Sequence, residues 1–277
     1  MGLRIMTNIQ ALTAQRNMGI NIDHQKATFE QLASGSRINR AADDAAGLAI
    51  SEKLKSQIRS IRQAARNSSD GVSMIQVAEG GMNEIGNILT RMRELSIQGA
   101  SDTIGDTERG FLNKEVQQLK NEVDRISNTT EFNGTKLLTG TSAPLEFQIG
   151  THNNPLLDRF VFDTQTLGTS VSALGLDGLA TDTKTGSQEN LQMLDNAIEH
   201  LSGNRATVGA LQNRLQSTIA NLGVSKENLE NANSRIRDTD FAEASSEMVK
   251  NNILTQANTA VLAQANATPQ LALKLLG

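Results

Sequence analysis

The sequence predicts a mainly α protein whose long antiparallel helices form a rod-like helical bundle or coiled coil, with a small β-hairpin region at the tip. Apolar residues recur at helical spacing over most of the chain, and only three prolines interrupt its 277 residues. Aromatic residues make up 3% of the chain. Leu, Ile, Val, Met and Ala must therefore fill the core, and these side chains suit the seams between packed helices.

The first long helix is expected from about residue 44 to residue 99, where apolar or small residues alternate at steps of four and three. They are Leu54, Ile58, Ile61, Ala65, Ser68, Val72, Ile75, Ala78, Met82, Ile85, Leu89 and Met92. A helix of this length spans about 80 Å, which exceeds a compact globule of this mass and indicates a rod. Asp43 and Asp44 stand at its start, where we interpret them as capping residues and not as paired catalytic carboxylates. Gly80 and Gly81 are expected to loosen the helix locally.

Two further helices follow from the same spacing. One is predicted around residues 112–126, with apolar residues again at steps of four and three. The other covers residues 194–236, where seven apolar residues in succession occupy one heptad position: Leu194, Leu201, Val208, Leu215, Leu222, Leu229 and Ile236. The second core position of these heptads holds small or polar residues. This pattern is typical of a helical bundle with closely approaching helices.

The centre of the chain has a different pattern. Asn133–Gly134 predicts a tight turn. Residues 145–149 alternate apolar and polar side chains, Asn153–Asn154–Pro155 follows, and residues 159–163 can form the returning strand of a β-hairpin. Residues from about 168 to 187 are rich in Gly, Thr, Ser and Asp and are expected to be loop. We expect the hairpin where the chain reverses direction, at one end of the rod.

Both chain ends are apolar yet nearly uncharged. Residues 251–277 contain one charged side chain, Lys274, among many Leu, Ala, Asn, Gln and Thr. A solvated terminal helix normally carries Lys and Glu, so a segment of this kind requires contacts on more than one face. Residues 5–32 have a similar composition. The two ends either pair only with each other or also pack on neighbouring copies of the chain.

The composition argues against several kinds of function. The chain has no Cys, and its three histidines, His24, His152 and His200, fall in different predicted elements. We therefore expect no catalytic, cofactor-binding or metal site, and we expect that the protein is not an enzyme. Basic residues are dispersed and the net charge is −4, which disfavours nucleic acid as a partner. No apolar run is long enough to predict a membrane span or the core of a cleavable signal peptide.

Several stretches resemble one known family. They are Gln31–Asn39, Ala41–Ser51, Leu89–Gln98, Glu131–Leu138, Leu211–Leu215, Ser234–Phe241, Val261–Asn266, Pro269–Gln270 and Leu275–Gly277. In this order they resemble the bacterial flagellins, over roughly residues 1–140 and 190–277. The short centre implies a flagellin without the large outer domains that many family members carry.

The resemblance implies an organisation and a function. Residues 1–42 and 237–277 would form a terminal coiled-coil domain in the inner core of a filament. Residues 43–236 would form a rod-like helical domain, with its central β-hairpin at about 130–185. The chain would be a structural subunit that self-polymerises head-to-tail into the flagellar filament, the passive propeller for swimming. The residues expected in the filament-core assembly helices are Ile5, Ile9, Leu12, Leu254, Val261, Leu262, Leu271 and Leu275.

Partners and location follow from the same resemblance. A flagellin is secreted to the extracellular flagellum without a cleavable signal peptide, and it meets the flagellar export apparatus, an export chaperone and the filament cap. Animal innate immune receptors contact flagellins at a helix surface, whose matching positions here are Arg91, Leu95 and Glu115. Thr90 departs from the Gln often found beside the Arg in the family. Packing or pairing within the rod is the simpler role for each of these residues.

Other functions remain as alternatives. A hook–filament junction protein of the same flagellum has related terminal helices, although the motifs at residues 43–47 and 261–266 favour the filament subunit. A secreted coiled-coil adhesin or a regulatory binding module would explain the heptads and would not explain the uncharged ends.

Overall fold

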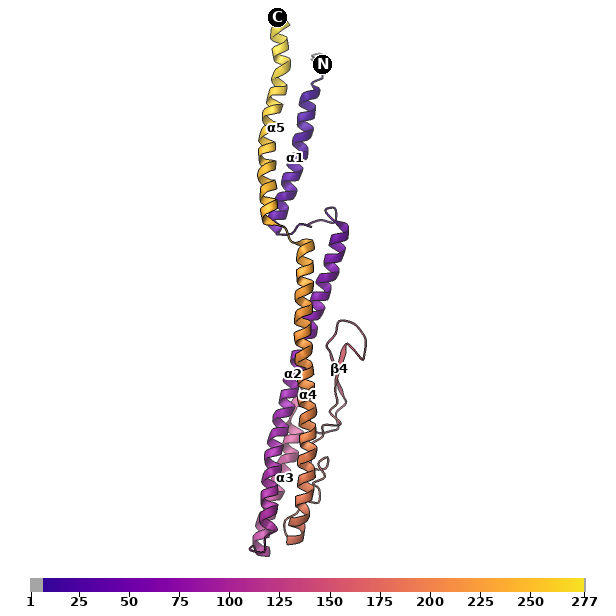
Figure 1. Cartoon of the computed structure of the whole chain (residues 1–277), viewed down its shortest axis with the longest axis vertical. Helices are drawn as coiled ribbons and strands as arrows, with labels where there is room; N and C mark the ends of the chain where they lie inside the picture. The colour runs from indigo at the N-terminus through magenta and orange to yellow at the C-terminus, as the bar shows by residue number, and fades with distance from the viewer. Residues whose placement is uncertain (1–6, 277) are drawn as a thin grey trace. The chain divides into compact units, whose positions relative to one another are not determined.

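The computed structural model describes residues 7–276, with side chains described as far as residue 268. The described residues are mainly helical, which confirms the predicted fold class. The helices are α1 (Ile9–Ser34), α2 (Ala45–Gly99), α3 (Asp106–Thr129), α4 (Lys184–Arg237) and α5 (Phe241–Leu276). Four short strands lie between α3 and α4: β1 (Glu131–Phe132), β2 (Thr135–Lys136), β3 (Leu145–Gln148) and β4 (Arg159–Phe162) (Figure 1). Residues 130–183 thus form the whole connection between α3 and α4, which confirms the short centre without large outer domains.

The chain divides into two compact units. One comprises residues 1–56 with 228–277, and the other comprises residues 57–227. The domain boundaries expected from the sequence, at 42/43 and 236/237, stay a prediction. None of the described helices is both long enough and apolar enough to cross a membrane.

The start of α2 follows from its capping residue. Asp44 accepts a hydrogen bond at 2.8 Å from the backbone N–H of Gly47, so it satisfies a donor that the first helical turn leaves free. Asp43 accepts from the backbone N–H groups of Arg40, at 2.8 Å, and Asn39, at 3.0 Å. These two bonds hold the pKa of the Asp43 carboxyl below its ordinary value, and the bond from Arg40 has the larger effect. The capping interpretation of the acidic pair is therefore confirmed for Asp44, while Asp43 orders the loop before the helix.

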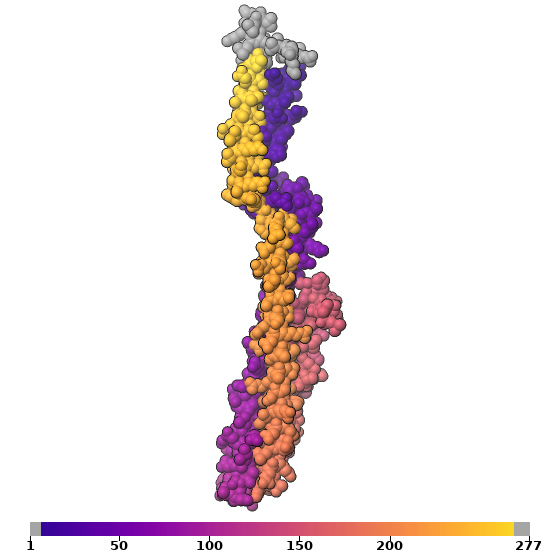
Figure 2. Space-filling view, in the orientation of Figure 1, coloured from indigo at the N-terminus to yellow at the C-terminus, as the bar shows by residue number. Residues whose placement is uncertain are grey.

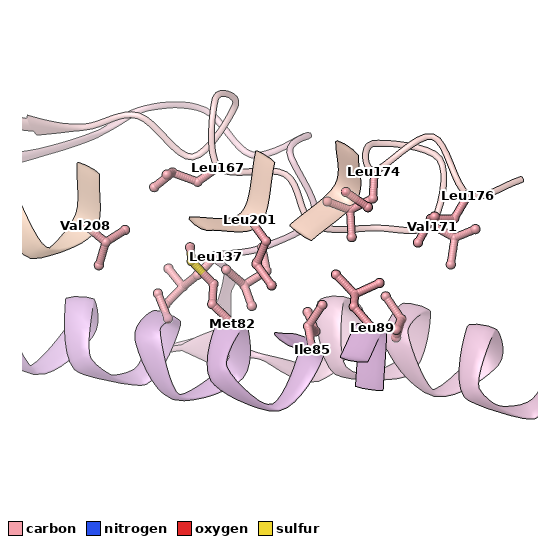
Figure 3. Close-up of a cluster of buried hydrophobic side chains, with 14 of the residues drawn as sticks. Met82, Ile85, Leu89, Leu137, Leu167, Val171, Leu174, Leu176, Leu201 and Val208 are labelled. Atoms are coloured by element: carbon pink, nitrogen blue, oxygen red, sulfur yellow. The ribbon is translucent and has the colours of Figure 1, made fainter. Parts of the chain in front are cut away.

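The core of the second unit lies between α2, α3 and α4. Residues from α2 such as Met82, Ile85 and Leu89 are fully buried against Leu201 and Val208 of α4 (Figure 3). Of the segment expected to be loop, residues 168–183 are irregular and residues 184–187 begin α4. Its buried side chains Val171, Leu174, Leu176 and Leu179 complete the core, together with Leu137, Leu138 and Leu167 from the preceding part of the connection.

Gly80 and Gly81 do not interrupt α2, so the expected loosening of the helix is wrong. Gly81 instead permits a close contact, since a Cβ there would lie 2.7 Å from Thr130 Oγ1 and 2.8 Å from Leu138 Cδ1. The helix stays intact because packing against this neighbouring segment outweighs the low helix propensity of glycine.

The two strand pairs are hairpins, and the longer one does not lie where the sequence suggested. Asn133 and Gly134, both with positive φ, form the turn between β1 and β2. Strand β3 pairs antiparallel with β4, as the alternation predicted. This hairpin packs along the helices (Figure 2). Asn67 of α2 donates to the carbonyl of Gln148 at 2.9 Å, and the Arg214 guanidinium of α4 lies 5.4 Å from the centre of the Phe160 ring.

The end of this unit is formed by another segment, the turn at residues 100–105 between α2 and α3. Lys184 at the start of α4 is paired with Asp102 of the turn at 2.7 Å. Buried Arg109 donates to the carbonyls of Gly99 and Ser101, each at 2.9 Å, and thereby caps the last turn of α2. The hairpin position at the tip is therefore wrong, because α3 returns along α2 before the strands begin.

Candidate self-association surface

In the first unit, α1 and α5 lie side by side and run in opposite directions (Figure 1). The Asn8 amide at the start of α1 donates to the carbonyl of Ala265 at 2.7 Å. Near the other end of the pair, the Gln25 amide donates to the Asn252 side-chain oxygen. The two chain ends therefore pair within one copy, as both alternatives left by the sequence require, and packing on neighbouring copies stays a prediction.

The seam between these helices follows a heptad pattern but contains few large apolar residues. Its α1 positions recur at steps of three and four and are buried or half-buried: Ala11, Ala14, Met18, Asn21, Gln25, Thr28 and Leu32. The α5 positions do the same: Ala244, Met248, Asn251, Thr255, Asn258, Leu262 and Ala265. Coiled coils normally place Leu, Ile or Val at these positions. Ala, Thr and amides bury little apolar area, so this seam alone stabilises the pair weakly.

Nine of the large apolar side chains described in these two helices are exposed instead. We call them the outer apolar residues: Ile9, Leu12, Ile20, Phe29, Phe241, Val249, Ile253, Leu254 and Val261. Leu12 is 70% exposed and Ile253 is 61% exposed. Each lies two residues from a buried seam position, Ala14 and Asn251 respectively, which places it about 160° around its helix from the seam. A folded single chain thus presents to water the side chains that would ordinarily form its core.

A network at the helix junction holds this pair within the first unit. Gly35 ends α1 in the left-handed conformation, and Ser36 forms an isolated antiparallel bridge with Asp238. The Arg37 backbone N–H donates to the carbonyl of Arg237 at 2.6 Å. The Arg237 guanidinium donates to Glu52 at 2.7 Å and, with Lys55, holds the pKa of the Glu52 carboxyl below its ordinary value.

The residues expected to mediate assembly fall into three groups. Ile9, Leu12, Leu254 and Val261 are among the outer apolar residues, whereas Leu262 is half-buried in the seam. Ile5 lies outside the described residues, and so do the side chains of Leu271 and Leu275. Sequence reasoning missed the other five outer apolar residues: Ile20, Phe29, Phe241, Val249 and Ile253. These five residues could have been identified from the sequence by placing the small and polar heptad positions of α1 and α5 in the seam, since the large apolar residues then fall on the outside.

The three residues matched to a receptor surface do not share one environment. Arg91 is half-exposed and its guanidinium contacts Glu115 at 3.0 Å and Glu94 at 3.0 Å. The hydrogen bonds that Arg91 donates to Glu94 and Glu115 raise the pKa of Arg91 above its ordinary value. Leu95 is 1% exposed and belongs to the helical core. Only Arg91 and Glu115 therefore present side chains on the surface, and the resemblance alone could not reveal the burial of Leu95.

Among the described residues, no group of three or more His, Asp or Glu side chains is arranged to hold a metal ion. His24, His152 and His200 lie in α1, the hairpin turn and α4, respectively. The arrangement of the first unit is suited to association.

Comparison with known proteins gives a consistent result. Residues 5–143 match a family model described as the bacterial flagellin N-terminal helical region, and residues 191–276 match the bacterial flagellin C-terminal helical region. A flagellin of Halalkalibacterium halodurans is 46% identical, over 97% of this chain and 98% of that protein. A flagellar filament core protein of Treponema maltophilum is 42% identical, over 97% and 98%. The crystal structure of Bacillus cereus flagellin is 30% identical with a TM-score of 0.50, covering 57% of this chain and 88% of that one.

Proposed function

This chain belongs to the bacterial flagellin family, and from that membership we propose that it is a structural subunit which self-polymerises into the flagellar filament through the outer apolar residues of α1 and α5. A flagellin is a structural component of an extracellular filament, so the role is mechanical. The hook–filament junction alternative is not favoured, because both family models are flagellin models and the two relatives compared above by sequence are a flagellin and a filament core protein.

One observation carries this proposal: the pair of terminal helices is apolar on the outside and polar in its seam. Burying one Ile, Leu or Val side chain contributes about 1.5–3 kcal/mol, and nine large apolar residues are exposed on these two helices. A second copy of the chain offers the same kind of surface. Contacts between two different faces of identical subunits form a ring if the rotation between subunits closes and a helical fibre if it does not, and for a filament subunit the rotation does not close.

We expect a charge among the outer apolar residues to stop growth while the fold persists. Ile253→Asp places a carboxylate where the fibre would bury a side chain, and the lost burial alone raises the critical concentration about tenfold or more. The measurement is light scattering and electron microscopy of full-length protein added to wild-type seeds. Asn87→Asp, at an exposed position of α2, adds the same charge elsewhere as a control. Normal elongation by the Ile253→Asp variant, with helix content unchanged by circular dichroism, would exclude this surface.

The accessory partners are part of the proposal. A subunit that travels to the end of an extracellular filament passes through the flagellar export apparatus, requires an export chaperone and folds beneath the filament cap. The weak seam supports this route, since helices that gain little from pairing alone are easily kept unfolded until a neighbouring copy covers them.

Recognition by a host innate immune receptor involves a separate surface, which we place at Arg91 and Glu115. Arg91→Ala removes the exposed guanidinium and should lower signalling by a flagellin receptor in a reporter cell line about tenfold, the effect of losing one charged contact. Arg125→Ala removes a guanidinium that is likewise paired, with Glu122 of α3, and is the matched control. Equal signalling by both variants and the wild-type protein would contradict this assignment.

A further inference from the structure

The turn of the β3–β4 hairpin presents two adjacent leucines to water, which we call the apolar knob. Leu156 is 86% exposed and Leu157 is 77% exposed. Their backbone is held in place, because the N–H of Leu156 donates to the side-chain oxygen of Asn154 at 3.0 Å and the N–H of Leu157 donates to the Asn154 carbonyl at 3.3 Å. The Asp158 carboxylate accepts from the backbone N–H of Asn154 at 3.0 Å. Large apolar side chains presented by such a turn indicate a surface that associates with another.

An apolar pocket lies elsewhere on the same unit, at the turn between α2 and α3. It has a volume of about 510 Å³, and Ile104, Phe111 and Leu112 supply its apolar lining. Phe111 is 63% exposed, and the Lys114 ammonium lies 5.5 Å from the centre of its ring. Glu108 contributes a carboxylate to the lining. An open pocket of this size with an aromatic wall can receive aliphatic side chains.

The knob and the pocket of one chain lie too far apart to meet. A Cβ at Gly71 of α2 would lie 3.8 Å from the ring of Phe147. Asn67, one turn earlier in α2, contacts Gln148, so β3 runs antiparallel to α2 and the turn after β3 points away from the pocket. From Asn67 to Gln98, which lines the pocket, α2 rises about 47 Å. The pocket can therefore receive the knob only from a second copy of the chain.

Charge and contact area define what kind of contact this is. Residues 149–157 contain no Asp, Glu, Lys or Arg, and the Asp158 carboxylate is engaged by backbone N–H groups of its own turn. The knob therefore brings no free carboxylate to the one that Glu108 contributes to the pocket. Two leucines bury far less than the roughly 800 Å² per partner of a stable interface. Such a contact does not hold two free chains together, and it strengthens an association that another surface supports.

We propose that the apolar knob of one copy inserts into the α2–α3 pocket of a second copy, as a further contact beside that of the outer apolar residues. Because the knob and the pocket are different surfaces of one chain, the contact is head-to-tail and leaves a free knob at one end of a row of copies and a free pocket at the other. Each added copy thus presents what the next one binds. This inference rests on the proposed function and adds to it a contact formed by residues 57–227.

The first test replaces both leucines of the knob in the full-length chain. The Leu156→Ser, Leu157→Ser double variant should elongate wild-type seeds about tenfold or more slowly, because every added copy lacks the knob that the pocket would bury. Its melting temperature by circular dichroism should stay within about 2 °C of wild type, since both side chains are exposed in the single chain. Val224→Ser, at a 61% exposed position of α4, is the matched control and should elongate within about twofold of wild type.

The second test detects the contact directly and does not depend on rates. The chain has no Cys, so a single introduced thiol is its only one. A Leu157→Cys chain and a Thr103→Cys chain are polymerised together and treated with a short bismaleimide; Thr103 lines the pocket beside its apolar residues. Mass spectrometry should find a product that joins one chain of each variant, in fibres and not in the unpolymerised mixture. Leu157→Cys with Val224→Cys is the control pair and should give only background.

The outcomes separate this inference from the proposed function. Elongation of the double serine variant within about twofold of wild type, or no more product from the Thr103→Cys pair than from the control pair, would overturn the knob-and-pocket contact. Equal slowing by Val224→Ser would also overturn it, because loss of any exposed apolar side chain would then have the same effect. If Ile253→Asp blocks growth while the double serine variant grows normally, only this inference fails. If Ile253→Asp grows normally, the surface of the proposed function fails instead.

Discussion

At the scale of single residues, two neighbouring glycines in α2 have opposite roles. A Cβ at Gly80 would have no atom within 4 Å, whereas one at Gly81 would lie within 3 Å of Thr130 and Leu138. Gly80→Ala should therefore raise the free energy of unfolding by about 0.5–1 kcal/mol, through the better helix propensity of alanine. Gly81→Ala should lower it by about 1–3 kcal/mol, because the extra methyl group overpacks the core.

Urea unfolding followed by circular dichroism measures both changes, and each glycine variant serves as the control for the other. A stabilising Gly81→Ala would mean that the segment at residues 130–138 moves aside without loss of packing.

At the scale of elements, the apolar heptad residues of α4 are fully buried in the first part of the helix and only half-buried in its last part. Leu194, Leu201, Val208 and Leu215 are buried, whereas Leu222, Leu229 and Ile236 are half-buried in the single chain. Leu215→Ala should lower the free energy of unfolding by about 2–5 kcal/mol, the usual effect of a cavity in a packed core. Leu222→Ala, one heptad later, should lower it by only about 1 kcal/mol. Chemical denaturation of monomeric protein measures both values, and equal losses would refute this difference in packing.

The sequence predicted most elements well and their placement less well. The steps of four and three gave α2, α3 and α4, and the acidic residue before Ala45 marked the start of α2. Alternation identified β3 and β4, because a period of two determines which residues share a face. It does not determine which helices the hairpin covers, so contacts such as that of Arg214 with Phe160 were not foreseen.

The candidate surface was predicted in part for a similar reason. The lack of charge in the tails indicated burial, and Ile9 and Leu12, which we expected in the assembly helices, are exposed on α1, while their role in assembly stays a prediction. Exposure of individual residues depends on which stripe of a helix forms the seam. Large apolar residues ordinarily occupy that stripe, and here Ala14, Thr28 and Asn251 do so. The same limitation hid the burial of Leu95, since a motif match carries no information on side-chain exposure.

At the scale of the whole molecule, exposed carboxylates couple stability to pH. Hydrogen bonds from Lys184, Arg125 and Arg93 lower the pKa values of Asp102, Glu122 and Asp195, respectively. Groups with lowered pKa values stabilise the fold above their unfolded pKa of about 4, and this contribution is lost as the pH falls through their folded values.

Thermal unfolding should therefore occur at nearly the same temperature between about pH 7 and 5 and at a progressively lower temperature below about pH 4. Circular dichroism melts across this range measure the effect. The loss should be smaller in about 1 M salt, where surface ion pairs are already screened. A melting temperature that rises on acidification would refute this account.

Helices α1 and α5 carry large apolar side chains on the outside and small or polar ones in their seam, and this arrangement has a consequence for how a fibre of these subunits responds to heat. On warming, α1 and α5 should unfold first, because the seam between them consists mainly of small residues and amides. Residues 57–227, whose core is rich in leucine, should remain folded at that temperature. If the outer apolar residues of α1 and α5 join the subunits as proposed, a heated fibre should release subunits whose interior stays folded, and cooling should let them add again to the remaining fibre ends. Disassembly would then be reversible, because one set of side chains joins the subunits and another keeps residues 57–227 folded.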